Sequence, residues 1–256
     1  MCLLLLSYNI DKNYKLIVAG NRDEYYNRPA KALGFWQDYP GILAGRDLKG
    51  GGTWLGVGHS GRIAAITNYR NPALHMDDAP SRGHLVSDYL AGAIPADRYL
   101  QYIKNRAHLY NGFNLITGSG SELFYYSNRG GGIKRLKPGL YGLSNHLLDT
   151  PWPKVKKGKA EFEKILAGSE KINTEDIFSI LCDTSRPGDA ELPVTGAGIK
   201  GERILSSIFI ISDIYGTRSS SIVLQDRQGR TTFYERTYLI KKSRVTGNET
   251  VILKFE

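Results

Sequence analysis

The sequence predicts an α+β protein in which two antiparallel sheets lie between paired helices, a four-layer αββα sandwich. Three observations lead to this fold class. Strand-like and helical segments follow one another as strands, two helices, strands, two helices and strands. Turns that contain glycine or other polar residues join successive strands as hairpins. The regular strand–helix alternation of a parallel doubly wound sheet is missing, which disfavours that fold.

The first quarter of the chain contains two predicted hairpins. The first pairs Leu3–Tyr8 with Tyr14–Ala19 around a short polar turn. The second pairs Thr53–Val57 with Arg62–Asn68 around His59–Gly61. Adjacent antiparallel strands are therefore expected near the N-terminus.

Two helical pairs are predicted from apolar side chains that recur at helical spacing. The first pair spans Gly83–Ala93 and Ala96–Tyr110, and the second spans about Lys156–Ala167 and Thr174–Cys182. Thr174 is expected to cap the fourth helix, because a hydroxyl at that position can accept a backbone N–H. Helices in consecutive pairs suit the outer layers of the sandwich.

The remaining strands follow each helical pair. After the first pair we expect strands at Phe113–Gly118, Glu122–Ser127, Gly132–Lys137 and Leu140–Leu143. After the second pair we expect strands at Ser207–Ser212, Ser219–Gln225, Thr231–Arg236 and Val245–Phe255. Ser185–Gly201 is rich in Pro and Gly and is expected to be a long loop, of a length that often carries function.

Length and composition suit one soluble globular domain over residues 1–256. The two cysteines, Cys2 and Cys182, provide no disulfide framework, so a reducing compartment is expected. No segment has the roughly 20 apolar residues of a membrane span. The Leu3–Leu6 run lacks the basic start and the length of a signal peptide. We therefore expect a cytoplasmic protein with no integral membrane segment.

The net charge of +9 is spread along the chain. A basic chain can bind nucleic acid or anionic small molecules. No nucleic-acid recognition motif is present, so a nucleic-acid partner is not expected. The densest basic cluster lies at the start of the third predicted helix and is expected to form a solvated helix face. It consists of Lys154, Lys156, Lys157 and Lys159.

Cys2 is the first candidate for chemistry, because it directly follows the initiator Met at the head of the first strand. Removal of Met1 would place a free α-amine beside the thiol as a general base. An α-amine has a pKa of about 7.7–8.0 and a cysteine thiol about 8.5, so the two can share a proton near neutral pH. The alternative interpretation is a small buried hydrophobic residue in the first strand.

Arg22 and Asp23 follow the second strand, and hairpin pairing brings the end of that strand back toward Cys2. The charge of an arginine favours a thiolate. The carboxylate of Asp23 could accept a hydrogen bond from the α-ammonium and fix its orientation. The alternative is a polar turn with a surface Arg–Asp pair, which stabilises little.

Two asparagines and a later arginine also lie at strand ends. Asn68 and Asn145 each follow an apolar strand, where an amide could stabilise a developing oxyanion. Arg218 follows the apolar segment at 208–211 and could bind an anionic substrate group. Each residue alone also fits an ordinary turn.

Taken in order, these pieces resemble the NRDE family, also called the transport and Golgi organisation protein 2 family. The resemblance runs from residue 1 to about residue 225. Its motifs are Met1-Cys2, Asn21-Arg22-Asp23-Glu24, Gly51-Gly52-Thr53-Trp54-Leu55-Gly56, Thr67-Asn68-Tyr69-Arg70, Leu143-Ser144-Asn145 and Tyr215-Gly216-Thr217-Arg218-Ser219-Ser220.

The resemblance implies an N-terminal nucleophile hydrolase-like αββα fold. More distantly, the chain is similar to cysteine amidases of the choloylglycine hydrolase and penicillin V acylase group, in which Cys becomes the nucleophile after Met removal. The positions that match the site of that group are Cys2, Arg22, Asp23, Asn68, Asn145 and Arg218. Trp54 belongs to the NRDE pattern and is expected on the substrate side of the cleft, with Asn21 and Tyr69.

Two function classes follow from this resemblance. The first is a hydrolase that cleaves an amide or thioester bond of a small anionic or acyl substrate. The second is a non-catalytic carrier, because the family is linked to haem trafficking and to acyl-lipid or coenzyme A metabolism; its ligand would be haem or an acyl-CoA. No cofactor or metal is expected in either class, although haem is a possible ligand. The candidate haem ligands, none in a metal-ligand spacing, are His59, His75, His84, His108 and His146.

Overall fold

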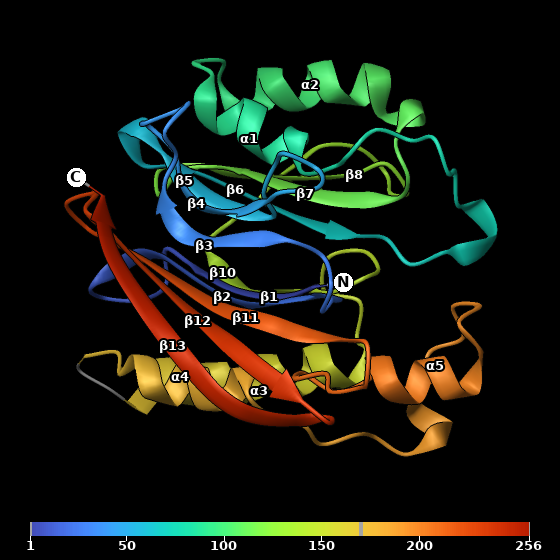
Figure 1. Ribbon diagram of the computed structural model, residues 1–256. Helices are drawn as coiled ribbons and strands as arrows, with labels where there is room; N and C mark the ends of the chain where they lie inside the picture. The colour runs from blue at the N-terminus through green and yellow to red at the C-terminus, as the bar shows by residue number, and fades with distance from the viewer. Residues whose placement is uncertain (1, 169–170, 256) are drawn as a thin grey trace.

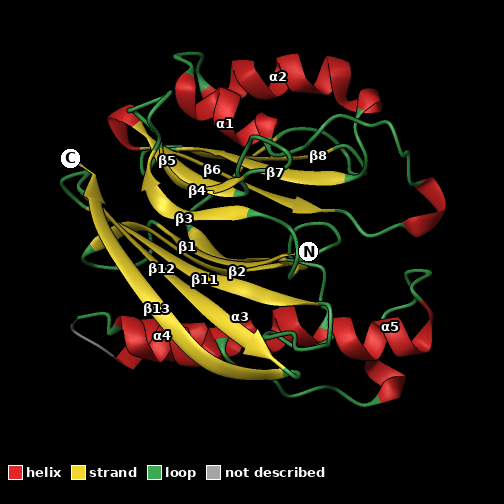
Figure 2. Ribbon diagram, viewed as in Figure 1, coloured by secondary structure: helices red, strands yellow, loops and turns green. Residues whose placement is uncertain are grey.

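The computed structural model describes residues 2–168 and 171–255, and it has the expected αββα layers. In Figure 1, two sheets face each other, α1 and α2 cover one sheet, and α3 and α4 cover the other. The colouring of Figure 2 separates the two strand layers from the helical layers outside them. The predicted α+β sandwich is confirmed.

The first sheet contains the strand that carries Cys2. Its order is β10-β1-β2-β11-β12-β13, and every neighbouring pair is antiparallel. The strands are β1 (Cys2–Tyr8), β2 (Tyr14–Tyr25), β10 (Gly139–Leu143), β11 (Tyr215–Asp226), β12 (Thr231–Lys241) and β13 (Arg244–Phe255). The expected first hairpin is therefore present, with β10 and β11 on either side of it.

The second sheet follows chain order from β3 to β9. Its strands are β3 (Ala30–Phe35), β4 (Leu43–Asp47), β5 (Leu55–Gly58), β6 (Arg62–Asn68), β7 (Phe113–Gly118), β8 (Leu123–Ser127) and β9 (Lys134–Arg135). Sequence patterns did not predict β3 and β4. Most side chains of β3 are exposed, so this edge strand lacks the apolar alternation that marks a half-buried strand.

The helices are α1 (His84–Ala91), α2 (Ala96–Arg106), α3 (Pro153–Gly168), α4 (Thr174–Leu181) and α5 (Gly198–Leu205). Short 3₁₀ turns occur at His59–Gly61, Pro72–Leu74, Ala107–Leu109 and Asp189–Glu191. Within the part of the chain that the structure describes, no helix is long and apolar enough to cross a membrane.

Three local predictions are wrong. The cap of α4 is Asn173, whose side chain accepts the Glu175 N–H at 3.1 Å, one residue before the expected Thr174. Ser185–Gly201 is not wholly a loop, because it contains a 3₁₀ turn and the start of α5. Ser207–Ser212 joins no sheet ladder. It is a buried segment whose backbone pairs locally, for example Thr217 N–H to Ile210 C=O at 2.8 Å.

Alternation along β1 divides its side chains between two cores. Leu4 and Leu6 face the opposite sheet, whereas Leu3 and Leu5 pack with residues of α3 and α4. Side chains of a strand alternate between faces, so Cys2 shares the face of Leu4 and Leu6. The sequence of β1 thus directs the thiol into the space between the sheets.

Candidate active site

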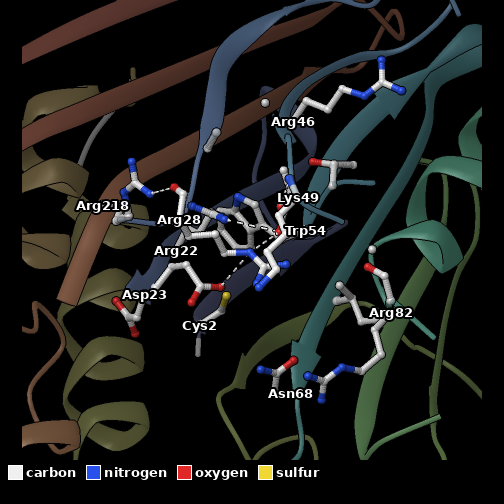
Figure 3. Close-up of a pocket in the computed structure, with 18 of the residues that line it drawn as sticks. Cys2, Arg22, Asp23, Arg28, Arg46, Lys49, Trp54, Asn68, Arg82 and Arg218 are labelled. Carbon is white, nitrogen blue, oxygen red and sulfur yellow. Dashed lines mark hydrogen bonds and ion pairs between the residues drawn. The ribbon is translucent and has the colours of Figure 1, made fainter. Parts of the chain in front are cut away.

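Strand pairing places Cys2 opposite Arg22. Cys2 pairs with Arg22 of β2, and Arg22 pairs with Ser219 of β11. Directly opposed residues of antiparallel strands share a face. The Cys2 side chain is only 7% exposed. It lines a cavity of about 650 Å³ between the two sheets, at the end where their ladders stop (Figure 3).

Six of the nine predicted site residues line this cavity. They are Cys2, Arg22, Asp23, Trp54, Asn68 and Arg218. Figure 3 shows all six, with contributions from both sheets. The four-residue stretch 21–24 lies inside β2 rather than after it, so the alternative of a polar turn is wrong and the register of the strand fixes these side chains.

The environment of Cys2 is buried and charged. Burial raises the pKa of the Cys2 thiol, and the negative charge of Asp23 raises it further. The positive charge of Arg22 and a hydrogen bond from the Asp23 backbone N–H act in the opposite direction. Hydroxyl Oγ of Ser144 donates to the Cys2 carbonyl at 3.3 Å, which ties β1 to the end of β10. The predicted α-amine depends on Met1, which lies outside the described residues.

Asp23 is 1% exposed and held in place by β11. Thr217 Oγ1 donates to Asp23 Oδ1 at 2.7 Å, and Tyr215 Oη donates to the Asp23 backbone carbonyl at 3.0 Å. Burial raises the pKa of the Asp23 carboxyl, and the charge of Lys154 opposes this rise. Lys154 is buried at 4% exposure, so the expected solvated lysine face does not include it.

Arg22 belongs to a charge group at the cavity wall. Asp47, the last residue of β4, accepts a hydrogen bond from Arg28 Nε at 2.7 Å and lies 3.8 Å from Arg22 Nη2. Arg28 also lies 3.7 Å from Glu24. Burial would raise the pKa of Asp47, but hydrogen bonds from the Gly50 N–H and Arg28 outweigh it and lower that pKa. Asp47 is therefore ionised, and its negative charge holds the side chains of Arg22 and Arg28 in place.

Arg218 lies in β11, so the alternative of an ordinary turn there is wrong, and its guanidinium donates to the backbone carbonyls of Tyr25 and Arg28. Among the described residues, no carboxylate lies within ion-pair distance of Arg218. The same holds for Lys49 and Arg82, which also line the cavity. The positive charges of these three side chains are therefore available to a ligand.

Asn145 joins the two sheets rather than lining the cavity. It is fully buried, and its Nδ2 donates to the Asn68 backbone carbonyl at 2.9 Å. Its Oδ1 faces Arg70 Nη2 at 3.4 Å, and its carbonyl accepts the Arg70 N–H at 2.7 Å. Asn68 itself lines the cavity, and its side-chain amide has no hydrogen-bond partner among the described residues. The two asparagines thus differ: one is committed to structure and the other faces open space.

Two predicted substrate-binding residues lie outside the cavity. Asn21 is fully buried on the helical side of the sheet, where its Nδ2 donates to the Leu181 and Ile208 carbonyls at 2.8 and 2.9 Å. The hydroxyl of Tyr69 contacts His146 Nε2 at 2.8 Å. Asn21 neighbours Arg22 in sequence, but strand alternation sends the two side chains to opposite faces. This geometry gives both residues structural contacts.

Sequence patterns did not single out several charged residues of the cavity. They are Arg28, Lys31, Arg46, Asp47, Lys49, Asp77, Arg82 and Glu235. The glycine triplet Gly50–Gly52 could have indicated Arg82, because consecutive glycines are typical of a close approach between backbone segments. A Cβ on Gly52 would lie 2.3 Å from the Gly83 backbone carbon, so this turn packs directly on the segment that carries Arg82. Such a close approach requires glycine.

No side-chain cluster suited to a metal is evident in the described ranges. There, no group of three or more His, Cys, Asp or Glu residues could hold a metal ion. Of the five histidines, His75 lines the cavity and is 61% exposed.

A comparison with protein families decides the affiliation of the chain. The family model described as Transport and Golgi organisation 2 matches residues 1–239. The chain belongs to this family. A Transport and Golgi organization 2 homolog of Mus musculus is 39% identical over 261 aligned positions, covering 94% of each chain. The Homo sapiens homolog is 38% identical with the same coverage, and the Drosophila melanogaster protein is 32% identical over 88% of this chain.

Solved structures place this family member among N-terminal nucleophile hydrolase-like folds. A mutant conjugated bile acid hydrolase from Clostridium perfringens matches with a TM-score of 0.53 at 10% identity, covering 100% of this chain and 97% of the other. A Caenorhabditis elegans ortholog of N-acylethanolamine-hydrolyzing acid amidase matches with a TM-score of 0.50 at 9% identity, covering 87% and 92%. At such identities, the likeness concerns the fold alone.

Proposed function

We propose that this protein is a cysteine hydrolase that cleaves an amide or thioester bond of a small anionic or acyl substrate. The observation that carries the proposal is the position of Cys2. Its thiol lines a cavity between the sheets, opposite Arg22, where cationic side chains without carboxylate partners also gather. By their printed names, the two solved proteins of similar fold are a conjugated bile acid hydrolase and an N-acylethanolamine-hydrolyzing acid amidase, which supports this class of reaction.

The proposed reaction has two steps. After removal of Met1, the α-amine of Cys2 accepts the thiol proton, and the sulfur attacks the substrate carbonyl. The C–N or C–S bond breaks as the amine returns the proton to the leaving group. Water then attacks the acyl–sulfur bond, the carboxylic acid is released and the thiol is restored. Asp23 orients the α-amine, and Arg22 favours the thiolate form of Cys2.

We assign the oxyanion donor to Asn68. Its amide lines the cavity and is free to donate, whereas the amide of Asn145 holds the Asn68 backbone. Donors that are fixed before the reaction stabilise developing negative charge most effectively. Asn145 then acts through Asn68 by holding the end of β6 against the end of β10.

The charge and shape of the cavity favour an anionic substrate with an apolar part. Lys49, Arg82 and Arg218 supply positive charge, and Trp54 supplies an aromatic surface. A thiol nucleophile requires reducing conditions. We therefore expect the reaction to take place in a compartment such as the cytoplasm.

The test is a panel of acyl thioesters and amides, each in an anionic and a neutral form, assayed for hydrolysis. We expect turnover of an anionic member, loss of it in Cys2→Ala, and normal turnover in the matched variant Cys182→Ala. Increasing salt should lower kcat/KM for the anionic form only, because screening weakens its attraction to the cavity. Turnover that survives in Cys2→Ala would overturn the proposal.

A second candidate is a carrier of haem or acyl-CoA on the same fold. The observation that favours it is the set of unpaired cations, since binding an anion requires no thiol. Haem binding would appear as a shift of the Soret band on titration. Tight binding unchanged by Cys2→Ala, without turnover of any panel member, would favour the carrier.

A further inference from the structure

Lys154 is a buried cation in an unfavourable place. It lies in the first turn of α3, which contains no acidic residue. The N-terminal end of a helix is its positive end and disfavours cations. The side chain is 4% exposed, and its Nζ has no hydrogen-bond partner among the described residues. Lysine is almost never buried in this way, and such departures from local rules concentrate at functional sites.

The charged groups around Lys154 come from four other segments. They are Asp23 of β2, Arg70 after β6, Cys2 of β1 and Glu202 of α5. Burial lowers the pKa of Lys154 to about 8, and the negative charge of Asp23 is the largest opposing influence. Lys154 is in turn the main cation that lowers the pKa of Asp23.

Arg70 contributes less net charge here, because its Nη1 forms a buried ion pair with Glu202 Oε2 at 2.8 Å. Arg22 lies on the opposite face of β2, near Asp47. Lys154 therefore places a positive charge on the helical side of β1 and β2 with no carboxylate within ion-pair distance among the described residues, and it acts on Asp23 and Cys2 through space rather than by contact.

We propose that Lys154 is a positioning residue whose buried charge keeps Asp23 ionised and favours the thiolate of Cys2. The inference rests on the proposed role of Cys2 as nucleophile. A cation in a medium of low polarity stabilises nearby anions strongly. No bond is formed or broken at Lys154, which does not line the cavity. The effect is present while Lys154 is charged and fades as pH rises through about 8.

The test follows the pH dependence of Cys2 alkylation by iodoacetamide. Cys182→Ala is used as the parent, so that one cysteine is labelled. In Lys154→Met, whose side chain has a similar length and no charge, we expect slower alkylation than in the parent below about pH 8, where Lys154 is charged. The rate near neutral pH should fall up to tenfold, since the thiolate is the reactive form, and the difference should fade at higher pH. Lys156→Met, at an exposed position of the same helix, is the matched control and should leave the rate near neutral pH unchanged.

A second readout does not depend on Cys2. The ¹³C resonance of the Asp23 carboxyl, assigned with Asp23→Asn, should titrate at higher pH in Lys154→Met than in the parent. An unchanged alkylation rate near neutral pH together with an unchanged carboxyl midpoint in Lys154→Met would overturn the inference, as would equal changes in Lys156→Met. Both changes in a protein that hydrolyses no panel member would support the inference while the proposed function failed.

Discussion

At the scale of single residues, the two asparagines of the site differ in their hydrogen bonds. The side-chain amide of Asn145 is hydrogen-bonded within the fold, whereas that of Asn68 has no partner among the described residues. Asn145 is fully buried and its Nδ2 is bonded to the Asn68 carbonyl, while the Asn68 side chain faces the cavity. Both asparagines follow apolar strands, so sequence context alone could not separate their roles. The hydrogen bonds of the folded chain separate these roles. They predict different effects when either asparagine is replaced by alanine.

We expect Asn68→Ala to lower kcat by about 100-fold, the usual cost of one oxyanion donor. Its effect on stability should be small, because the side chain has no bonded partner among the described residues. Asn145→Ala should instead lower the free energy of unfolding by about 1–3 kcal/mol, because the Asn68 carbonyl loses its donor in a buried place. Urea unfolding and steady-state kinetics on both variants measure the two effects. An Asn145→Ala protein of unchanged stability would contradict the assignment.

The burial of Lys154 also predicts how the free energy of unfolding depends on pH. The pKa of its amino group falls from 10.5 to about 8 on folding, so the charged form costs stability below about pH 8. The cost is relieved between about pH 8 and 10.5, where the folded state has already lost the proton that the unfolded state keeps. Lys154→Met should therefore raise the free energy of unfolding by up to about 3 kcal/mol at pH 7.

The gain in Lys154→Met should shrink as pH rises toward 10. Thermal unfolding of the parent and the variant across this range measures the difference. A variant less stable than the parent at pH 7 would mean that the attraction between Lys154 and Asp23 exceeds the cost of burial.

At the scale of elements, register explains which parts of the site the sequence could predict. Hairpin pairing of the first two strands correctly brought Arg22 beside Cys2. The same alternation places Asn21 on the helical face, although it was expected on the substrate side of the cleft. The weakly patterned strands β3 and β4 were missed, and with them Asp47, which orders the arginines. Such contacts depend on pairing between distant segments, which local sequence does not encode.

Glycine packing between elements gives a further test. A Cβ on Gly52 would meet the Gly83 backbone at 2.3 Å, at the junction of the glycine triplet with α1. We expect Gly52→Ala to cost about 1–3 kcal/mol of stability through overpacking. It should also weaken anionic ligand binding, because Arg82 adjoins Gly83 in the chain. Gly131→Ala, with no atom within 4 Å of the added Cβ, is the matched control. Equal stability of the two variants by thermal unfolding would contradict this packing.

At the scale of the whole molecule, the site lies where two sheets from distant parts of the chain meet. The first sheet supplies Cys2, Arg22 and Arg218, and the second supplies Asn68. The ends of β6 and β10 are held together by Asn145, and Thr67 Oγ1 donates to the Ser144 carbonyl at 2.7 Å. The αββα sandwich therefore acts as the frame that brings a thiol, cations and an amide donor to one cavity.

The central claim is that Cys2 is an N-terminal nucleophile, and intact-mass spectrometry of the purified chain tests it most directly. The spectrum is recorded before and after a rapid quench with an anionic acyl thioester. The account predicts a chain that lacks Met1 and gains one acyl group at Cys2, with no acylation in Cys2→Ala and full acylation in Cys182→Ala. A chain that retains Met1, or that is acylated equally in Cys2→Ala, would contradict it.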